Sequence, residues 1–387
     1  MAESVVKSYF PSQTVSDLEK LSYEYGLKVG KAIETEWFNN DRNQNKYKNN
    51  YNNYHNLRLY ARGEQSVQKY KDELSINGDL SYLNLDWSPV PIIPKFVDIV
   101  VNGIAERTYD VKAFSQSQNG VDKRTEYMEN IMSDMELKDF NDLIMAEFGL
   151  DMKESEEKEL PENTEELGIH MQLNYKQAVE LAQEQAINVL MEGNKYELTK
   201  KRFYYDLTVL GIGAVKTNFT TSEGITIDYV DPANLVYSHT DSPYFDDIYY
   251  VGEVKSIPIN ELVKQFPHLT EGDIEEIVQN RSHRRNNNNS RYSTDREDNN
   301  KIQVLYFNYK TYMNEVYKIK ETGTGADKAI ERDDTFNPPA DAEGNYMKLQ
   351  RSIECLYDGA LILGTDKLLK WEMASNMMRP KSDFTKV

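Results

Sequence analysis

The sequence predicts an α+β fold, because apolar residues follow a helical period in the first half of the chain and a strand period afterwards. Helical spacing dominates up to Gly213. The period then changes to two in residues 214–219 and 225–230, which predicts a small antiparallel sheet. A buried helical stripe is expected at positions i, i+3, i+4 and i+8, occupied by Phe96, Ile99, Val100 and Ile104.

The chain is long but poor in apolar residues. Its 387 residues favour two or three folded units. Only 39% of the residues are hydrophobic, 28% are charged and the mean hydropathy is −0.71, so part of the chain is expected to be extended or to need a partner. The net charge of −19 argues against broad electrostatic binding of nucleic acid, which depends on clustered Lys and Arg.

The single cysteine, Cys355, excludes an internal disulfide and leaves a structural zinc site without its usual thiolates. A reducing compartment is therefore expected. The N-terminal residues lack the apolar core of a signal peptide, and the longest apolar runs are too short to span a membrane. The sequence thus predicts a soluble protein without membrane association.

Two tracts of low complexity, residues 39–56 and 283–300, lack a periodic apolar face and are expected to be mobile. The first is rich in Asn, Lys and Tyr. A tract of this composition can also stack on single-stranded nucleic acid, so a single-stranded nucleic-acid-binding protein stays open as an alternative. The same residues are enriched along the whole chain, which favours a mobile arm without a ligand over a nucleic-acid-binding arm.

No segment carries a strong catalytic or ligand-binding signal, so no catalytic, cofactor-binding or metal-binding residue is assigned and the chain is not expected to be an enzyme. Residues 211–217, GIGAVKT, resemble a shortened phosphate loop, but Val215 stands where glycine is required. A helix stop is predicted there instead. The five histidines are scattered. A turn rather than a cation site is predicted for the polar cluster His239, Asp241, Asp246 and Asp247.

The last third of the chain contains the most regular strand patterns. Residues 258–280 are predicted to be helical with a break near Pro267. Residues 301–322 alternate as a β-hairpin would, and residues 352–364 are predicted to form a second two-stranded unit around Asp358 and Gly359.

Several segments together resemble portal proteins of tailed bacteriophages, most closely those of crAss-like phages. The resemblance covers most of the chain. It is carried by LYARGEQSVQKY, NLDWSPVPIIPKFVDIVVNGIAERTYDV, PENTEELGIHMQLNYKQAVELAQEQAI, DLTVLGIGAVKT and GITIDYVDPANLVYSHTDSPYFDDIYYVGEVKSIPINELVKQFPHL.

The resemblance implies a structural protein of the virion, assembled in the host cytoplasm into a ring of twelve subunits at one capsid vertex. Such a portal is the conduit for genome packaging and ejection and acts as the head-tail connector. The implied partners are the large terminase, a head-tail adaptor or connector protein, the major capsid protein and double-stranded DNA passing through the channel. Another virion structural protein, of the tail or baseplate, remains an alternative.

Portal architecture, with its wing of helices and small antiparallel sheets, a stem helix and a small β clip, implies a division of this chain. The segments are an arm at 1–56, a wing at 57–256, a stem-type helix at 257–282, a linker at 283–300, a clip-like β module at 301–364 and the start of a return segment at 365–387. Because portals continue with a returning stem helix, the chain is expected to be incomplete.

Two sets of residues receive roles in this interpretation. Large amphipathic side chains on short strands suit an interface, so Tyr306, Tyr309, Tyr312 and Tyr317 are assigned to oligomer or partner contacts. Scaffold turns without catalytic function are assigned to Asp231, Pro232, Asp241 and Pro243.

Overall fold

The chain is a mixed α+β protein that divides into two compact units. The first comprises Met1–Glu106 and Leu198–Val387, and the second comprises Arg107–Glu197. This division differs from the predicted segments, because residues 107–197 separate from the remainder of the predicted wing. The computed structural model describes residues 9–38, 45–75, 86–88, 90–107, 110–150, 153, 160–173, 175–220, 224–285, 301–321, 327–337, 346–374 and 381–386.

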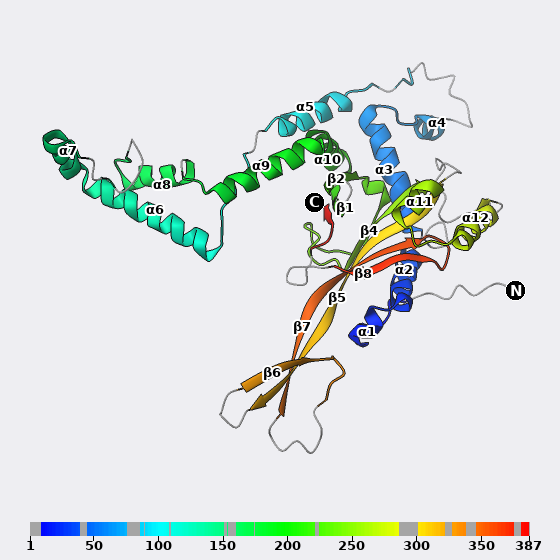
Figure 1. Ribbon diagram of the computed structural model, residues 1–387. Helices are drawn as coiled ribbons and strands as arrows, with labels where there is room; N and C mark the ends of the chain where they lie inside the picture. Colours follow the sequence, from blue (N-terminus) through cyan, green and yellow to red (C-terminus); the bar gives the residue numbers. More distant parts are fainter. Residues whose placement is uncertain are drawn as a thin grey trace. The chain divides into compact units, whose positions relative to one another are not determined.

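An antiparallel six-stranded sheet forms the centre of the first unit (Figure 1). Its order is β3-β4-β5-β7-β8, and β6 pairs with the far end of β5. The strands are β3 (Leu235–Tyr237), β4 (Tyr250–Pro258), β5 (Lys301–Glu321), β6 (Asp327–Arg332), β7 (Tyr346–Ile362) and β8 (Leu368–Met373).

The two hairpins predicted within 301–322 and 352–364 are instead two long strands paired with each other. The β5–β7 ladder runs from Val304↔Ile362 to Lys320↔Tyr346. Asp358-Gly359 forms no turn: Gly359 lies against Phe307, and a Cβ there would stand 2.4 Å from Cζ of that ring. Glycine at this position permits a close approach of the ring rather than a reversal of the chain. Because β5 and β7 also pair with β4 and β8 in the same sheet, the prediction of a separate clip-like module at 301–364 is wrong.

Helices cover both faces of the sheet near its base. Helix α2 (Tyr23–Trp37) buries Val29, Ile33 and Trp37, spaced four residues apart, on one face. Helices α11 (Ile259–Gln265) and α12 (Glu271–Arg285) cover the other, where Leu262 and Ile277 pack. The predicted break near Pro267 is confirmed. Short α1 (Asp17–Lys20) precedes α2.

A second, three-stranded sheet has the order β2-β1-β9, formed by β1 (Ala214–Thr220), β2 (Gly224–Val230) and β9 (Phe384–Lys386). The predicted antiparallel pairing of β1 with β2 is confirmed. The predicted helix stop is also confirmed: α10 (Tyr196–Leu210) ends just before Gly211, whose φ is +77°. Lys216 therefore lies in a strand, outside the loop-to-helix setting of a phosphate loop.

The expectation of a mobile arm over 39–56 is wrong for residues 46–56, which belong to helix α3 (Lys46–Arg62). The Asn45 side chain caps this helix by accepting a hydrogen bond from the Lys48 N–H at 2.9 Å. Tyr47 is buried against Phe38, with ring centroids 4.7 Å apart. The ring of a tyrosine thus supplies apolar contacts to this helix, although the composition of residues 46–56 is polar. The tract at 283–300 lies outside the described residues beyond Arg285.

Helix α5 (Ile93–Ala105) buries a different face from the predicted one. Val97, Val101 and Ala105 are buried, whereas Phe96 and Ile99 are 61% and 59% exposed. Apolar residues surround most of this helix, so spacing alone did not distinguish its faces. The short α4 (Gln68–Leu74) lies between α3 and α5 in the sequence.

The second unit is helical in its described part. It contains α6 (Gln118–Glu136), α7 (Lys138–Phe148), α8 (Thr164–Leu173) and α9 (Ala178–Gly193).

Candidate interaction surfaces and a basic pocket

Two of the four tyrosines assigned to an interface pack within the first unit, Tyr309 as a buried residue and Tyr306 as a partly buried one. Tyr309 has no exposed surface, so its assignment to a subunit contact is wrong. It pairs with Tyr250 of β4 in the middle of the sheet. Tyr306 is half-buried, stacks on Phe266 and donates a hydrogen bond to Oε1 of Gln265 at 2.6 Å.

The other two tyrosines lie farther out along β5. The Nζ of Lys20 lies 4.2 Å from the ring centroid of Tyr312, and Tyr317 donates a hydrogen bond to Glu315 at 3.2 Å. Both side chains keep some exposed surface. They remain candidates for a partner contact.

The predicted scaffold turns occur at both sites. Asp231 precedes a single turn of 3₁₀ helix, η1 (Pro232–Asn234), and its Oδ1 accepts a hydrogen bond from the Ala233 N–H at 2.9 Å. In the second turn, which contains Pro243, the Asp241 N–H donates to Oδ2 of Asp247 at 2.9 Å. His239 and Asp241 form an ion pair at 3.2 Å with both side chains largely in solvent.

Beyond the sheet base, β5, β6 and β7 form a narrow three-stranded arm (Figure 1). β8 pairs with β7 only over Tyr357–Leu361. The outer edge of β7 along residues 346–355 consequently has no strand partner among the described residues. Met347 and Leu349 are exposed there. An open edge with apolar side chains can accept a strand or a neighbouring surface.

In the second unit, helix α9 buries charged residues and exposes apolar ones. Glu180 is fully buried and accepts hydrogen bonds from the Ser115 N–H at 2.7 Å and from Arg124 at 2.8 Å. Glu184 binds Lys176, and this hydrogen bond lowers the pKa of Glu184. The exposed side chains of α9 include Val179, Leu181, Ile187 and Val189, the last of them 67% exposed.

Helix α7 repeats this inverted arrangement. Its buried residue is Asn141, whereas its apolar side chains Phe140, Leu143, Met145 and Phe148 are exposed. Phe148 is 70% exposed. Isolated exposed apolar residues are ordinary, but a helix that presents most of its apolar side chains to water is a candidate interaction surface.

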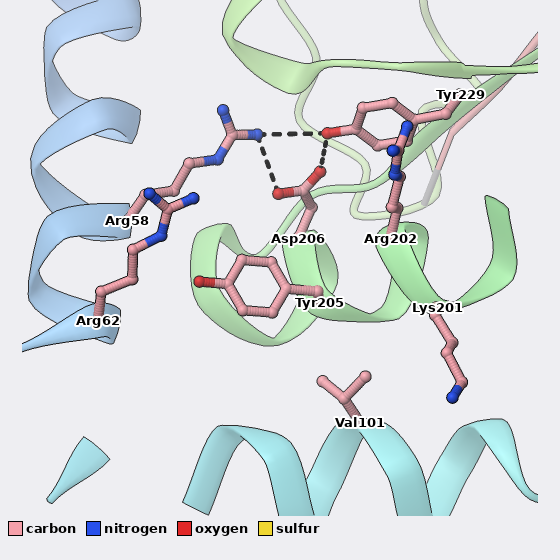
Figure 2. Close-up of a pocket in the computed structure, with 8 residues that line it drawn as sticks. All are labelled: Arg58, Arg62, Val101, Lys201, Arg202, Tyr205, Asp206 and Tyr229. Atoms are coloured by element: carbon pink, nitrogen blue, oxygen red, sulfur yellow. Dashed lines mark hydrogen bonds and ion pairs between the residues drawn. The ribbon is translucent and has the colours of Figure 1, made fainter. Parts of the chain in front are cut away.

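A basic pocket of about 400 Å³ lies in the first unit, between α3, α5 and α10 (Figure 2). Figure 2 shows Arg58 and Arg62 reaching in from α3, while Tyr205 and Asp206 come from α10. The eight lining residues are Arg58, Arg62, Val101, Lys201, Arg202, Tyr205, Asp206 and Tyr229.

A hydrogen-bonded network fixes one side of this pocket. Arg58 binds Asp206 at 2.9 Å, and the Tyr229 hydroxyl donates to the other oxygen of Asp206. Burial raises the pKa of the Asp206 carboxyl, and the hydrogen bonds from Tyr229 and Arg58 oppose that shift. Burial likewise raises the pKa of Tyr229. The guanidinium of Arg202 lies 5.9 Å from the ring centroid of Tyr229.

The sequence interpretation missed this pocket. Arg58 and Arg62 are four residues apart on one helix, which already indicates a positive face. Lys201 and Arg202 come from a segment more than a hundred residues later, and no local pattern connects the two pairs.

In the described part of the chain, no group of three or more His, Cys, Asp or Glu side chains is arranged to hold a metal ion. None of the described helices has both the length and the apolar character needed to cross a membrane. No protein-family model matches the sequence, and comparison with curated proteins finds no match.

Proposed function

We propose that the chain is a structural subunit of a bacteriophage portal, a ring at one capsid vertex through which double-stranded DNA is packaged and ejected. The observation that carries the proposal is the inverted burial on α7 and α9, where apolar side chains are exposed and polar ones are buried. Covering such surfaces with a neighbouring molecule removes apolar area from water and is therefore favourable.

A ring supplies such neighbours repeatedly. In a heterologous interface, one surface of each subunit contacts a different surface of the next, and the contacts close when the rotation divides a full turn. The exposed apolar residues of α5 and the open edge of β7 are further surfaces of this kind. The sequence resemblance to portal proteins implies that the ring is a dodecamer, with terminase and a head-tail adaptor as its docking partners.

Two rival functions receive less support. Single-stranded nucleic-acid binding would require a mobile arm whose tyrosine rings are free to stack on bases. Residues 46–56 are instead helical and Tyr47 is buried. A tail or baseplate protein would also expose surfaces for assembly, and its symmetry would differ from that of a portal.

Electron microscopy of the purified full-length product tests the proposal. Class averages are expected to show twelvefold rings with a central hole, and mass measurement in solution should give the matching multiple of the subunit mass. A monodisperse monomer at micromolar concentration without rings would overturn it. Rings or fibres of another symmetry would favour the tail or baseplate alternative.

A further inference from the structure

The β arm carries its charges unevenly on its two faces. Alternate residues of a strand, and residues directly opposite each other in a ladder, project on the same face of a sheet. The registers of β5 with β6 and with β7 therefore place five cationic side chains on one face, which we call the basic face: Lys318, Lys320, Lys328, Arg332 and Lys348. The other described side chains of these strands on that face between residues 316 and 350 are uncharged, namely Val316, Ile330 and Gln350.

The contacts of Phe336 and Asn337, which follow β6, agree with this assignment. The Lys318 Nζ and the Arg332 Cζ lie 5.9 and 6.0 Å from the ring centroid of Phe336. The Lys348 Nζ donates a hydrogen bond to Oδ1 of Asn337 at 3.3 Å. Side chains from all three strands thus meet the same short segment, as residues of one face should.

The opposite face of the arm has a different character. Glu315 stands directly opposite Arg351 there, so one acidic side chain faces one basic side chain. Tyr317 donates its hydroxyl proton to Glu315 on the same face. Met347 and Leu349, also on this face, are exposed apolar residues. The lysines are therefore segregated to one face and are not spread evenly over the arm.

The basic face is unfavourable for the folded arm by itself. Lys318 stands directly opposite Lys348, and Lys320 stands directly opposite Lys328. Like charges in this position destabilise a sheet. Lysines on the outer strands β6 and β7 can protect open edges from aggregation, but β5 is the central strand of the arm. In a chain of net charge −19, this clustering indicates a surface that receives an anionic partner.

We propose that the basic face of the β arm contacts the phosphate backbone of double-stranded DNA. Alternate residues of β5 are about 6.8 Å apart and neighbouring strands about 4.8 Å apart, so the cations form a flat array that does not converge on one small anion. Such an array suits a linear polyanion, and a DNA duplex carries one charge per about 1.7 Å of its axis. Lysine, a mobile point charge, can bind phosphates without reading the base sequence.

Other anionic partners fit less well. Lysine is depleted in protein–protein interfaces, where arginine and aromatic residues are enriched. A single strand needs aromatic rings on which its bases stack, and the Phe336 ring already lies against Lys318 and Arg332. The net negative charge of the chain does not prevent a local contact, because charges more than about 8 Å away are largely screened at physiological ionic strength.

The test is fluorescence anisotropy of a labelled random-sequence duplex titrated with the purified full-length chain. A single strand of the same length and a labelled poly-glutamate peptide are the comparison probes. The duplex should bind most tightly of the three. Between about 20 and 200 mM potassium chloride, the logarithm of its affinity should fall against the logarithm of salt concentration with a slope of at least about −3, which corresponds to three or more phosphates contacted.

The double variant Lys328→Gln/Lys348→Gln removes one lysine from each opposed pair. It should weaken duplex binding at the lowest salt concentration at least about tenfold and make the slope shallower by about 2 for each subunit in contact with the duplex. Its melting temperature should be unchanged or higher, because two cross-strand repulsions are relieved. A purely structural role of these lysines would instead lower the melting temperature. The control Lys28→Gln/Lys264→Gln removes two exposed lysines of α2 and α11 and should leave the slope unchanged.

Absence of duplex binding at the lowest salt concentration would overturn this assignment, as would an unchanged affinity and slope in Lys328→Gln/Lys348→Gln. Tighter binding of the single strand would also overturn it, and preference for poly-glutamate would assign the basic face to an acidic protein instead. The contact rests on the portal proposal for the presence of duplex DNA at the arm, but its test requires no ring. Twelvefold rings that bind no duplex would overturn the contact alone, and duplex binding by a stable monomer would overturn the portal proposal alone.

Discussion

Arg58 and Asp231, 173 residues apart in the sequence, are joined by two parallel hydrogen bonds, Nη1 to Oδ2 at 3.0 Å and Nη2 to Oδ1 at 2.8 Å. Asp231 at the same time holds the turn η1 through the Ala233 N–H. The turn predicted from Asp-Pro is therefore also the anchor that fixes helix α3 against the two strands it connects.

Loss of this anchor should destabilise the first unit. Arg58→Ala removes the partner of Asp206, whose side chain is only 3% exposed, and leaves that carboxylate without its cation. Removal of one member of a largely buried pair typically costs about 3 kcal/mol or more. Chemical denaturation should show this loss of unfolding free energy. Arg62→Ala, one turn along the same helix and without an ion pair in the described residues, is the matched control and should change stability by less than about 1 kcal/mol.

Acid stability should depend on Asp273 of α12. Hydrogen bonds from Lys367, at 2.5 Å, and from Thr270 hold the pKa of Asp273 well below its ordinary value of 3.8. Below about pH 4 the unfolded chain binds a proton that the folded chain does not, so this stabilisation is complete above that pH and is lost as the pH falls further. The melting temperature of Asp273→Asn should consequently decline less steeply on acidification. The exposed neighbour substitution Glu275→Gln should leave the slope unchanged.

Gly252 should not tolerate a side chain. A Cβ at this position of β4 would lie 2.5 Å from the carbonyl oxygen of Tyr306, a backbone atom held in the sheet. Gly252→Ala is expected to cost about 1–3 kcal/mol of unfolding free energy, as overpacking does elsewhere. Gly272→Ala has nothing within 4 Å and lies in helix α12, so it should be neutral or stabilising by up to about 1 kcal/mol. Equal destabilisation by both variants would contradict the close packing of β4 on β5.

Assembly should depend on the exposed face of α9. Val179→Glu/Val189→Glu places two charges on a surface that the portal proposal covers with a neighbour, so rings should dissociate or fail to form. Asn52→Glu/Asn53→Glu adds the same charge at exposed polar positions of α3, away from this helix, and is the matched comparison. Mass photometry measures both. If the two double variants assemble equally well, this face is not a subunit contact.

The β arm can be removed without removing the sheet base. Replacing residues 316–350 with Asn-Gly joins the paired residues Glu315 and Arg351 by a short turn. Because β4 and β8 pair with the retained parts of β5 and β7, the melting temperature should fall by only a few degrees. Pull-down of the terminase or adaptor by truncated rings should be lost in the portal proposal, and retained docking would exclude the arm as the docking site. Deletion of the entire 301–364 segment would instead unfold the sheet.

The sequence alone was sufficient to predict those structural features that depend on neighbouring residues in the chain. The change from helical to alternating spacing identified the α+β class, Gly211 marked the end of α10, and Asp231-Pro232 marked a turn. Each of these depends on the conformational preference of one residue or on the pattern within one element, which the sequence displays directly.

Burial and pairing required the tertiary structure. Both faces of α5 are apolar, so only the segments packed against it decide that Val97 and Val101 are buried while Phe96 is not. Strand β7 continues through Gly359 because the ring of Phe307 packs against that glycine. The helix at 46–56 is stabilised by the packing of Tyr47 in a core formed by residues remote in the sequence. The basic pocket likewise exists only because α3, α5 and α10 meet. The residues that surround a buried side chain are mostly remote from it in the sequence. The free energy of burying that side chain therefore depends on its tertiary neighbours and not on the residue type alone.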